Sequence, residues 1–205
     1  MNAYPAVPLS TLGNQLDHIA NWIRHFVYVH VDTFDKDPDE RAMTALLVTF
    51  LSFVANPAPA IYCPTQAEEA LLGYDFSIKY TETDGHGVQR LVEVLIQAKV
   101  MKPDSTDAPH VNWYYDNANG YQIDLLATAV VNARQTQQNA HVVGGYIIYS
   151  SDAVQFVPLA AIDNALADVG GRNVSAQQER WLTDRLCVTN GANYPLRLLG
   201  TFPMQ

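Results

Sequence analysis

The chain has 205 residues, of which 48% are hydrophobic and 16% charged, and it carries 21 acidic residues against 12 lysines and arginines. This length and composition fit one folded domain with a buried core, and they argue against a disordered, collagen-like or disulfide-rich protein. The formal net charge of −9 argues against non-specific coating of nucleic acid, because that kind of binding needs clustered basic residues.

The two cysteines, Cys63 and Cys187, lie far apart and do not have the spacing of a zinc site. We expect reduced thiols in a reducing compartment, and a single disulfide stays open as the alternative. The first ten residues lack the basic and apolar regions of a signal peptide. The longest apolar stretch, 42–55, is shorter than the roughly 18–20 residues that span a bilayer. We therefore expect a soluble, cytoplasmic protein that does not bind membranes.

Hydrophobic periodicity and capping patterns predict the elements of the first half of the chain. The segment beginning at Asp37 predicts a helix start with an acidic N-cap and Glu40 at the third helical position. That helix should be apolar on most sides and buried. Thr65 and Glu68 form a capping box, and Gly73 ends the helix that it opens. The predicted elements are helices at 13–31, 39–55 and 66–72, a short strand at 60–63, and strands at 74–81 and 90–100 joined by a turn at 84–87.

The second half of the chain begins with a polar loop, 102–119, that contains Trp113 and two tyrosines. These aromatic side chains either stack on nucleic-acid bases or pack on the sheet as a lid. The following elements are a helix at 121–134, an apolar strand at 142–149, and helices that open near 157 and at 175. The order predicts a single α/β domain over residues 1–205. Its core covers about 38–150, with the helix at 13–31 and the helices at 157–186 as additions.

Three polar residues are expected to meet at one end of the predicted sheet. Gln97 and Lys99 lie on the same face of one strand, since side chains alternate with period two. The preceding hairpin places Asp75 on the neighbouring strand, at the face opposite Phe76. A carboxylate, an amide oxygen and an ammonium group together suit phosphodiester hydrolysis, because oxygen ligands hold Mg²⁺ and a lysine stabilises an anionic transition state.

The segment Gly73–Ile78, followed by a strand that ends in Ile96-Gln97-Ala98-Lys99, resembles the PD-(D/E)XK nuclease superfamily. The form with glutamine in place of the usual acid is similar to Mrr-type restriction endonucleases. The resemblance covers roughly residues 39–150 and implies a restriction-endonuclease-like αβββαβ core, with a mixed central sheet flanked by helices. It also implies metal-dependent hydrolysis of nucleic acid, with DNA expected, in restriction or anti-phage defence.

The resemblance also implies roles for individual residues. Asp75 and Gln97 take the metal-binding positions, and Lys99 takes the catalytic position. Glu69 resembles an extra acid that some members carry before the second motif, which makes it a third ligand of Mg²⁺ or Mn²⁺. Gln122, near the start of the following helix, matches a glutamine that faces the site and positions water or phosphate.

Each of these residues also has an ordinary structural interpretation. Asp75 suits a strand-end residue that accepts backbone hydrogen bonds, and Lys99 suits a solvated charge. Gln122 suits a surface position on its helix. Glu68 fits the capping box, which leaves Glu69 as the better metal candidate. Glu40 at the third helical position suits a helix cap, and it is also the alternative to Glu69 as the acid that helps Asp75 to hold metal.

Two other functions remain open. The chain is either a non-catalytic interaction module that keeps the nuclease-like fold, or a different α/β domain in which the match is accidental. The acidic charge and the missing acid at position 97 favour the module. If the protein does cut nucleic acid, its own binding should be weak, and a homodimer or a partner protein should supply the rest.

Overall fold

The computed structural model describes residues 9–34, 39–54, 59–83, 87–101, 110–113, 116–137, 140–150, 152–170, 175–188, 194 and 196. Its main element is a five-stranded mixed sheet in the order β1-β2-β3-β6-β7. One neighbouring pair in this sheet, β3 and β6, is parallel, and the other neighbours are antiparallel. The described elements are α1 (Leu9–Phe34), α2 (Glu40–Val54), β1 (Ala60–Tyr62), α3 (Gln66–Leu72), β2 (Phe76–Thr83), β3 (Gln89–Val100), β4 (Asp116–Asn117), β5 (Gly120–Tyr121), α4 (Gln122–Thr136), β6 (Ala140–Tyr149), β7 (Val154–Pro158), α5 (Leu159–Asp168), α6 (Ala176–Thr183) and the π-helix η1 (Asp184–Val188).

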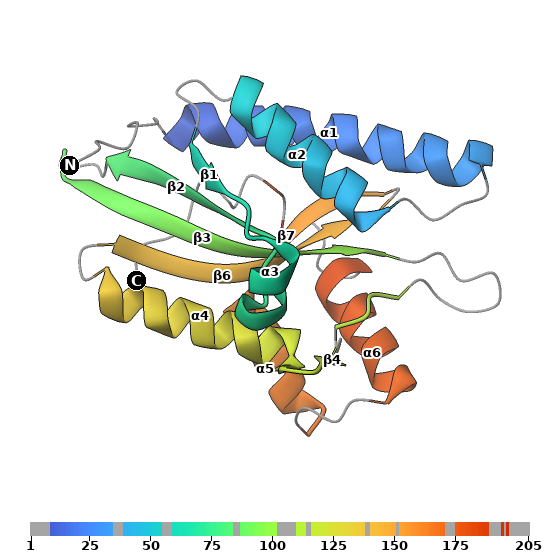
Figure 1. Ribbon diagram of the computed structural model, residues 1–205. Coiled ribbons are helices and arrows are strands. Elements are labelled where there is room, and N and C mark those ends of the chain that lie inside the picture. The colour runs from blue at the N-terminus through green and yellow to red at the C-terminus, as the bar shows by residue number, and fades with distance from the viewer. Residues whose placement is uncertain are drawn as a thin grey trace.

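Helices cover both faces of the sheet, as Figure 1 shows. Helices α1 and α2 pack on one face through a buried cluster that includes Leu16, Leu47 and Phe76. Helices α4, α5 and α6 pack on the other face through a second cluster that includes Leu126 and Ile162. The predicted α/β class is therefore confirmed at the level of a mixed sheet packed against helices. Helix α1 contributes three fully buried residues to the first cluster, so it forms part of the core.

The hairpin of β2 and β3 forms as the alternating pattern predicts. Phe76 pairs with Ile96, and the register continues to Thr83 opposite Gln89. Because the side chains alternate, the residues between the apolar positions of the first cluster face the other side of the sheet. The register therefore brings Asp75, one residue before β2, next to Gln97 on β3. Residues 84–86 of the predicted turn lie outside the described part of the chain.

Helix α2 differs from its prediction in two ways. The cap is Asp39, whose side chain accepts a hydrogen bond from the backbone N–H of Arg41 at 3.0 Å. Glu40 is therefore the first residue of the helix and does not occupy the third position. Residues 37 and 38 lie outside the described part of the chain. The helix is also not buried on most sides: Met43 and Leu47 are buried, but Phe53 is 85% exposed. Apolar residues such as Ala42, Ala45 and Phe53 lie on the exposed side of this helix, so its sequence did not separate a solvent face from a buried face.

Strand β7 was missed by the sequence patterns, which predicted a helix opening near residue 157. Residues Val154–Pro158 instead pair antiparallel with β6, and Pro158 is the N-cap of α5. Gly145 permits this pairing, because a Cβ atom there would lie 2.5 Å from the ring of Phe156 and 2.6 Å from a backbone oxygen. The segment Val154–Val157, which has two valines and a phenylalanine, and the polar turn before it are a sequence signal for this strand.

The aromatic residues of the loop 102–119 were expected either to stack on bases or to pack on the sheet, and Trp113 decides between these two alternatives for its own side chain. Trp113 is fully buried, and its ring stacks on Tyr146 with centroids 5.8 Å apart. Its ring nitrogen donates a hydrogen bond to the hydroxyl of Thr183 on α6 at 3.0 Å. Trp113 therefore packs on the sheet and does not present its ring to nucleic acid. The two tyrosines that follow, 114 and 115, lie outside the described residues.

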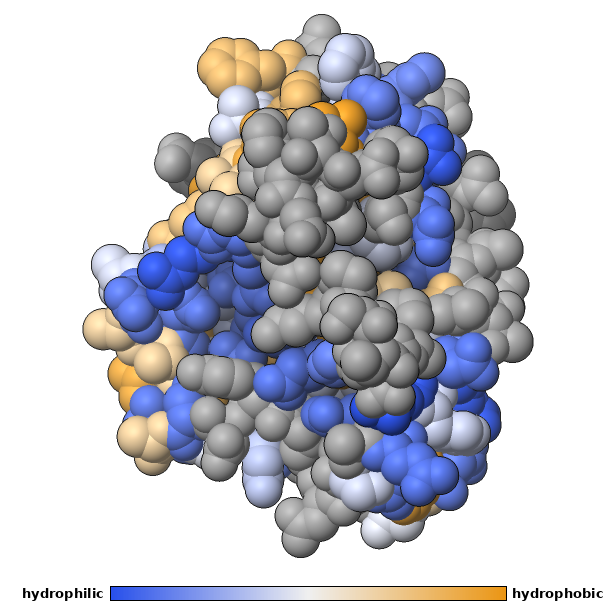
Figure 2. All heavy atoms as spheres, turned by 90° about the vertical axis from the view of Figure 1, so that its right-hand side faces the viewer, coloured by the Kyte–Doolittle hydropathy of each residue, from blue (hydrophilic) through white to orange (hydrophobic). Residues whose placement is uncertain are grey.

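Three further features concern the cysteines, the surface and the helices. Both cysteines are free: Cys63 is exposed and Cys187 is buried. Figure 2 shows hydrophilic side chains over most of the coloured surface on one side of the molecule, with apolar side chains in separate groups. Among the described helices, none combines the length and apolar character that crossing a membrane requires.

Candidate functional site

Asp75 lies just before β2, and three hydrogen bonds to β3 hold it at this end of the sheet. Its backbone N–H donates to the carbonyl of Ile96 at 2.8 Å. Its carboxylate Oδ2 accepts from the side-chain amide of Gln97 at 2.6 Å and from the backbone N–H of Ala98 at 2.5 Å. The predicted meeting of Asp75 and Gln97 is therefore present. Both donors bind the same oxygen, so Oδ1 is the oxygen left to face other groups.

Gly73 brings the end of α3 against the start of α4. It caps α3 with a left-handed backbone, φ 70°. A Cβ atom at this position would lie 2.6 Å from the backbone oxygen of Gln122, so a larger residue would push the two helices apart. This contact places Glu69, Asp75 and Gln122 around one space. Glu68 forms the predicted capping box with Thr65, which leaves Glu69 as the acid of α3 that faces the space.

Lys99 is not a solvated charge, since it is only 8% exposed. Its Nζ forms an ion pair with Oε1 of Glu40 at 3.4 Å. Glu40 was expected to cap its helix from the third position. As the first residue of α2 it instead points to the end of β3, where its carboxylate holds the ammonium group of Lys99. The capping interpretation of Glu40 is therefore wrong.

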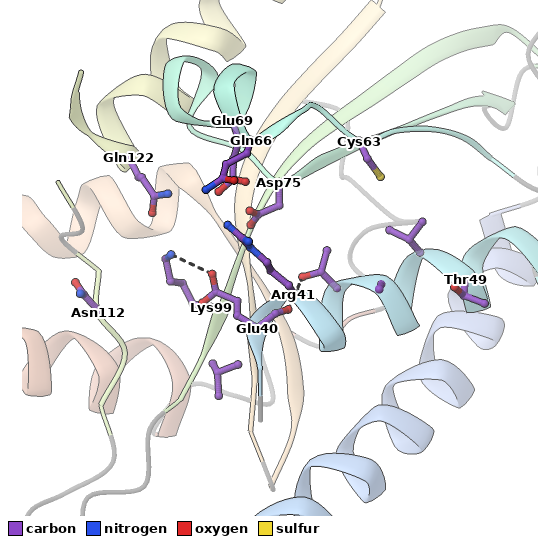
Figure 3. Close-up of a pocket in the computed structure, with 14 residues that line it drawn as sticks. Glu40, Arg41, Thr49, Cys63, Gln66, Glu69, Asp75, Lys99, Asn112 and Gln122 are labelled. Atoms are coloured by element: carbon purple, nitrogen blue, oxygen red, sulfur yellow. Dashed lines mark hydrogen bonds and ion pairs between the residues drawn. The ribbon is translucent and has the colours of Figure 1, made fainter. Parts of the chain in front are cut away.

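These side chains surround a cavity of about 780 Å³ (Figure 3). The first turn of α2 forms one wall, with Asp75 and α3 across from it. Several lining residues are exposed, so the cavity is open to solvent. Gln97 is fully buried beneath the wall and does not line the space. The lining residues are Glu40, Arg41, Thr44, Ala45, Val48, Thr49, Cys63, Gln66, Glu69, Asp75, Lys99, Val100, Asn112 and Gln122.

The environment of Asp75 raises the pKa of its carboxyl group from 3.8 to about 7. Burial is the main cause, and the negative charges of Glu69 and Glu40 add to it. The hydrogen bond from Ala98 and the charge of Lys99 oppose the shift. A carboxylate that is costly to ionise in isolation gains from a nearby cation, so this electrostatic setting favours the binding of positive charge beside Asp75.

Replacing Asp75 by asparagine should change how stability depends on pH. Because the folded-state pKa of the carboxyl group is raised, the wild type loses unfolding free energy as the pH rises from about 4 to about 7. The side-chain oxygen of the asparagine can accept the same two hydrogen bonds without titrating. In EDTA, the unfolding free energy of Asp75→Asn relative to wild type should increase by about 2 kcal/mol or more between about pH 4 and about pH 8. Urea titrations at both values measure it, and a pH-independent difference would contradict the shift.

Two buried amide oxygens at this site lack a hydrogen-bond partner among the described residues. Oε1 of Gln122 belongs to a side chain that is 5% exposed and lines the cavity. Oε1 of Gln97 lies behind Asp75. Gln122 was as readily interpreted as a surface residue, and its burial excludes that interpretation. An unpaired buried carbonyl oxygen is costly, so Gln122 is suited to a ligand, a water or a cation in the cavity.

The oxygen donors of this site suit a cation such as Mg²⁺, which keeps part of its water shell, and do not enclose a metal on all sides. Within the described residues, no three histidine, cysteine, aspartate or glutamate side chains gather closely enough to form a ready-made metal site. Mg²⁺ is commonly bound by one or two carboxylates together with water and substrate oxygens. Asp75 and Glu69 supply carboxylates to the cavity, and Gln122 supplies the unpaired amide oxygen. The chemistry of this set is all oxygen, which is what a hard cation requires.

Sequence reasoning missed part of this cavity. Arg41 lines it beside Glu40, and Asn112 lines it from the segment after the polar loop. Choosing Asp39 as the helix cap would have made Glu40 and Arg41 the first two residues of α2. No pattern in the sequence points to Asn112, because its position depends on the packing of Trp113 next to it.

The chain was also compared with known proteins. No protein-family model matches its sequence, and no curated protein does.

Proposed function

We propose that this chain is a metal-dependent nuclease that hydrolyses phosphodiester bonds, with DNA as the expected substrate and a PD-(D/E)XK-like site. The observation that carries the proposal is the convergence of Asp75, Lys99 and Glu69 on one open cavity, with Gln97 hydrogen-bonded to Asp75. A carboxylate pair, a buried lysine and an unpaired amide oxygen are what this chemistry needs.

The arrangement of the elements gives further support. Helix α2 is followed by the antiparallel strands β1, β2 and β3, then by α4 and by β6, which runs parallel to β3. This order agrees with the αβββαβ core that the resemblance implies, apart from α3 between β1 and β2 and the short strands β4 and β5, which form a separate sheet, between β3 and α4. Asp75 lies just before the start of β2 and Lys99 near the end of β3, beside the start of α2, and Glu69 reaches the same cavity from α3.

Asp75 and Glu69 would hold the cation, with Gln122 as a further oxygen donor. When bound there, Mg²⁺ or Mn²⁺ lowers the pKa of a coordinated water and neutralises charge on the phosphate. Gln97 keeps Asp75 in place through its amide N–H, and its predicted role as a direct ligand stays a prediction. Where Oε1 of Gln122 does not bind the cation, it would instead accept a hydrogen bond from the attacking water and so orient it.

Lys99 supplies positive charge where negative charge develops in the transition state. Its ammonium group is nearly buried, and Glu40 holds it at the cavity. A lysine in this setting donates hydrogen bonds to a non-bridging phosphate oxygen or to the attacking water. Arg41, on the same wall, can bind the neighbouring phosphate.

A nuclease assay tests the proposal. The purified chain, incubated with plasmid and with single-stranded DNA, should cut in Mg²⁺ or Mn²⁺ and should stop in EDTA. The net charge of −9 predicts weak binding, so the protein is used in large excess over the nucleic acid. Absence of cleavage on every nucleic acid, at low salt and with either cation, would contradict the proposal.

One observation favours a non-catalytic interaction module as the second candidate. Asp75 already has two hydrogen-bond donors on Oδ2, so the site is assembled without a cation. Calorimetric titration with Mg²⁺ and Mn²⁺ separates the two functions. Binding at millimolar concentration or tighter supports the nuclease, and no binding in that range supports the module.

A further inference from the structure

The cavity extends well beyond the acidic residues, along the outer face of α2. Its α2 residues occur at 40, 41, 44, 45, 48 and 49, which is one face of a helix. At 1.5 Å per residue this face is about 13 Å long. Figure 3 shows Glu40 and Arg41 at one end and Thr49 near the other, with Cys63 on the opposite side. The cavity is therefore an elongated groove.

The two ends of the groove differ in chemistry. The end at the start of α2 carries the acids, Lys99 and Arg41. The far end is formed by Ala45, Val48 and Thr49 of α2 and by Cys63 after β1. These side chains are small, and they combine apolar surface with hydroxyl and thiol groups. Such a wall suits the flat faces of a base and the edge of a sugar, and it leaves room for both.

The charge of the groove argues against a bound duplex. Among the described residues that line it, the cations Arg41 and Lys99 both lie at the catalytic end. A duplex carries one phosphate charge per about 1.7 Å of its axis, and a single strand carries one per about 3.4 Å. A duplex along a groove about 13 Å long would thus bring roughly eight negative charges into a groove whose lining holds three acids, Glu40, Glu69 and Asp75, against those two cations. A single strand halves that repulsion.

The volume leads to the same conclusion. A cavity of about 780 Å³ lies within the range of sites for small molecules. It has room for one or two nucleotides.

We propose that the groove along α2 binds an unpaired strand and holds the one or two nucleotides next to the scissile phosphate. This inference rests on the proposed nuclease function and adds the class of substrate to it. The protein then acts on single strands or on unpaired ends, and the duplex part of a substrate stays outside the groove.

Two alanines of α2 provide a matched test. Ala45 lines the groove, whereas Ala42 lies on the same helix, is also exposed, and does not line it. Ala45→Trp fills the groove, and Ala42→Trp places the same side chain on open surface, so both variants should fold. Cleavage of a fluorescein-labelled single-stranded oligodeoxynucleotide, a blunt hairpin duplex and a duplex with an overhang is measured in Mg²⁺ for wild type and both variants.

We expect the single strand and the overhang to be cut at least about tenfold faster than the blunt duplex. Ala45→Trp should lower cleavage of the single strand by about tenfold or more, and Ala42→Trp should leave it within about twofold. Equal rates on single strand and blunt duplex, or equal effects of the two tryptophans, would overturn the inference while leaving the nuclease function intact.

Labelling of a thiol in the groove measures strand binding separately from cleavage, so the strand-binding proposal and the nuclease proposal can fail independently. Cys63 lines the groove and is exposed, whereas Cys187 is buried, so a thiol reagent should label Cys63 first. The single-stranded oligonucleotide should slow this labelling, and the hairpin duplex should not. The variant Cys63→Ser should lose the fast labelling, which shows that the labelled thiol is Cys63. Protection by the single strand without any cleavage supports strand binding and contradicts the nuclease. Protection by the duplex alone, or by neither, contradicts the inference.

Discussion

Replacing Lys99 by methionine lowers the rate of phosphodiester cleavage by about 100-fold or more in the Mg²⁺-dependent assay. Methionine keeps the length of the side chain but removes the ammonium group that Glu40 holds at the cavity. The Glu40 side chain is 37% exposed, so water can solvate its carboxylate after the change, and the fold should survive. Single-turnover rates at saturating enzyme measure the loss at the chemical step.

Two variants control this prediction. Lys99→Arg keeps the charge and should retain more activity than Lys99→Met. Lys79→Met removes the ammonium group of Lys79 on β2, which forms an ion pair with Glu93 on β3 at 3.0 Å. Lys79 does not line the cavity. Glu93 is nearly buried, so this variant should lose stability, but Glu93 keeps a 2.6 Å hydrogen bond from Gln137, and the folded variant should cut near the wild-type rate. If Lys99→Met cuts as well as Lys79→Met, the activity belongs to another site or another protein.

Replacing Gln97 by glutamate should make stability depend on metal. Gln97 is fully buried, and its amide nitrogen lies 2.6 Å from Oδ2 of Asp75. A carboxylate there removes the hydrogen-bond donor and places a second acid against the first. In EDTA near neutral pH, Gln97→Glu should lower the unfolding free energy by about 3 kcal/mol, because a buried charge loses its compensation. Added Mn²⁺ should recover most of this loss, since two carboxylates form a stronger oxygen site than one.

Gln97→Met is the matched control for this prediction. It has a similar volume and also loses the hydrogen bond, but it adds no charge. Its melting temperature should fall in EDTA and should gain no more from Mn²⁺ than that of the wild type. Thermal unfolding of the three proteins with and without the cation makes the comparison. Equal Mn²⁺ shifts in Gln97→Glu and Gln97→Met would show that position 97 does not face a cation.

Local patterns were sufficient to predict the elements that carry the site. The capping box at Thr65 and Glu68 and the glycine at position 73 are confirmed, because they depend on bonds within a few residues. The alternation of β2 and β3 predicted which side chains share a face, and the register follows from the buried apolar positions. The meeting of Asp75 and Gln97 therefore follows from these local patterns alone. The metal, the substrate and the role of each residue remain predictions.

The failures occur where distant segments decide the outcome. Strand β7 forms because β6 offers it a free edge and because Gly145 leaves space for the ring of Phe156, and neither fact is visible in residues 154–158 alone. Glu40 was assigned to a cap because Asp37 and Asp39 are equally good N-caps in sequence. The structure uses Asp39, which turns Glu40 toward Lys99, 59 residues away along the chain.

The excess of acidic over basic residues argued against non-specific coating of nucleic acid, and the sequence by itself determined the strand pair at whose end Asp75, Gln97 and Lys99 lie. Only the tertiary structure decided that α2 lies beside that pair, and with it that Glu40 neutralises Lys99 and that a groove of about 780 Å³ opens along the helix. The reason is physical. Hydrogen bonding and side-chain alternation act between near neighbours, whereas a cavity and the pKa of a buried carboxyl group depend on every segment packed around them.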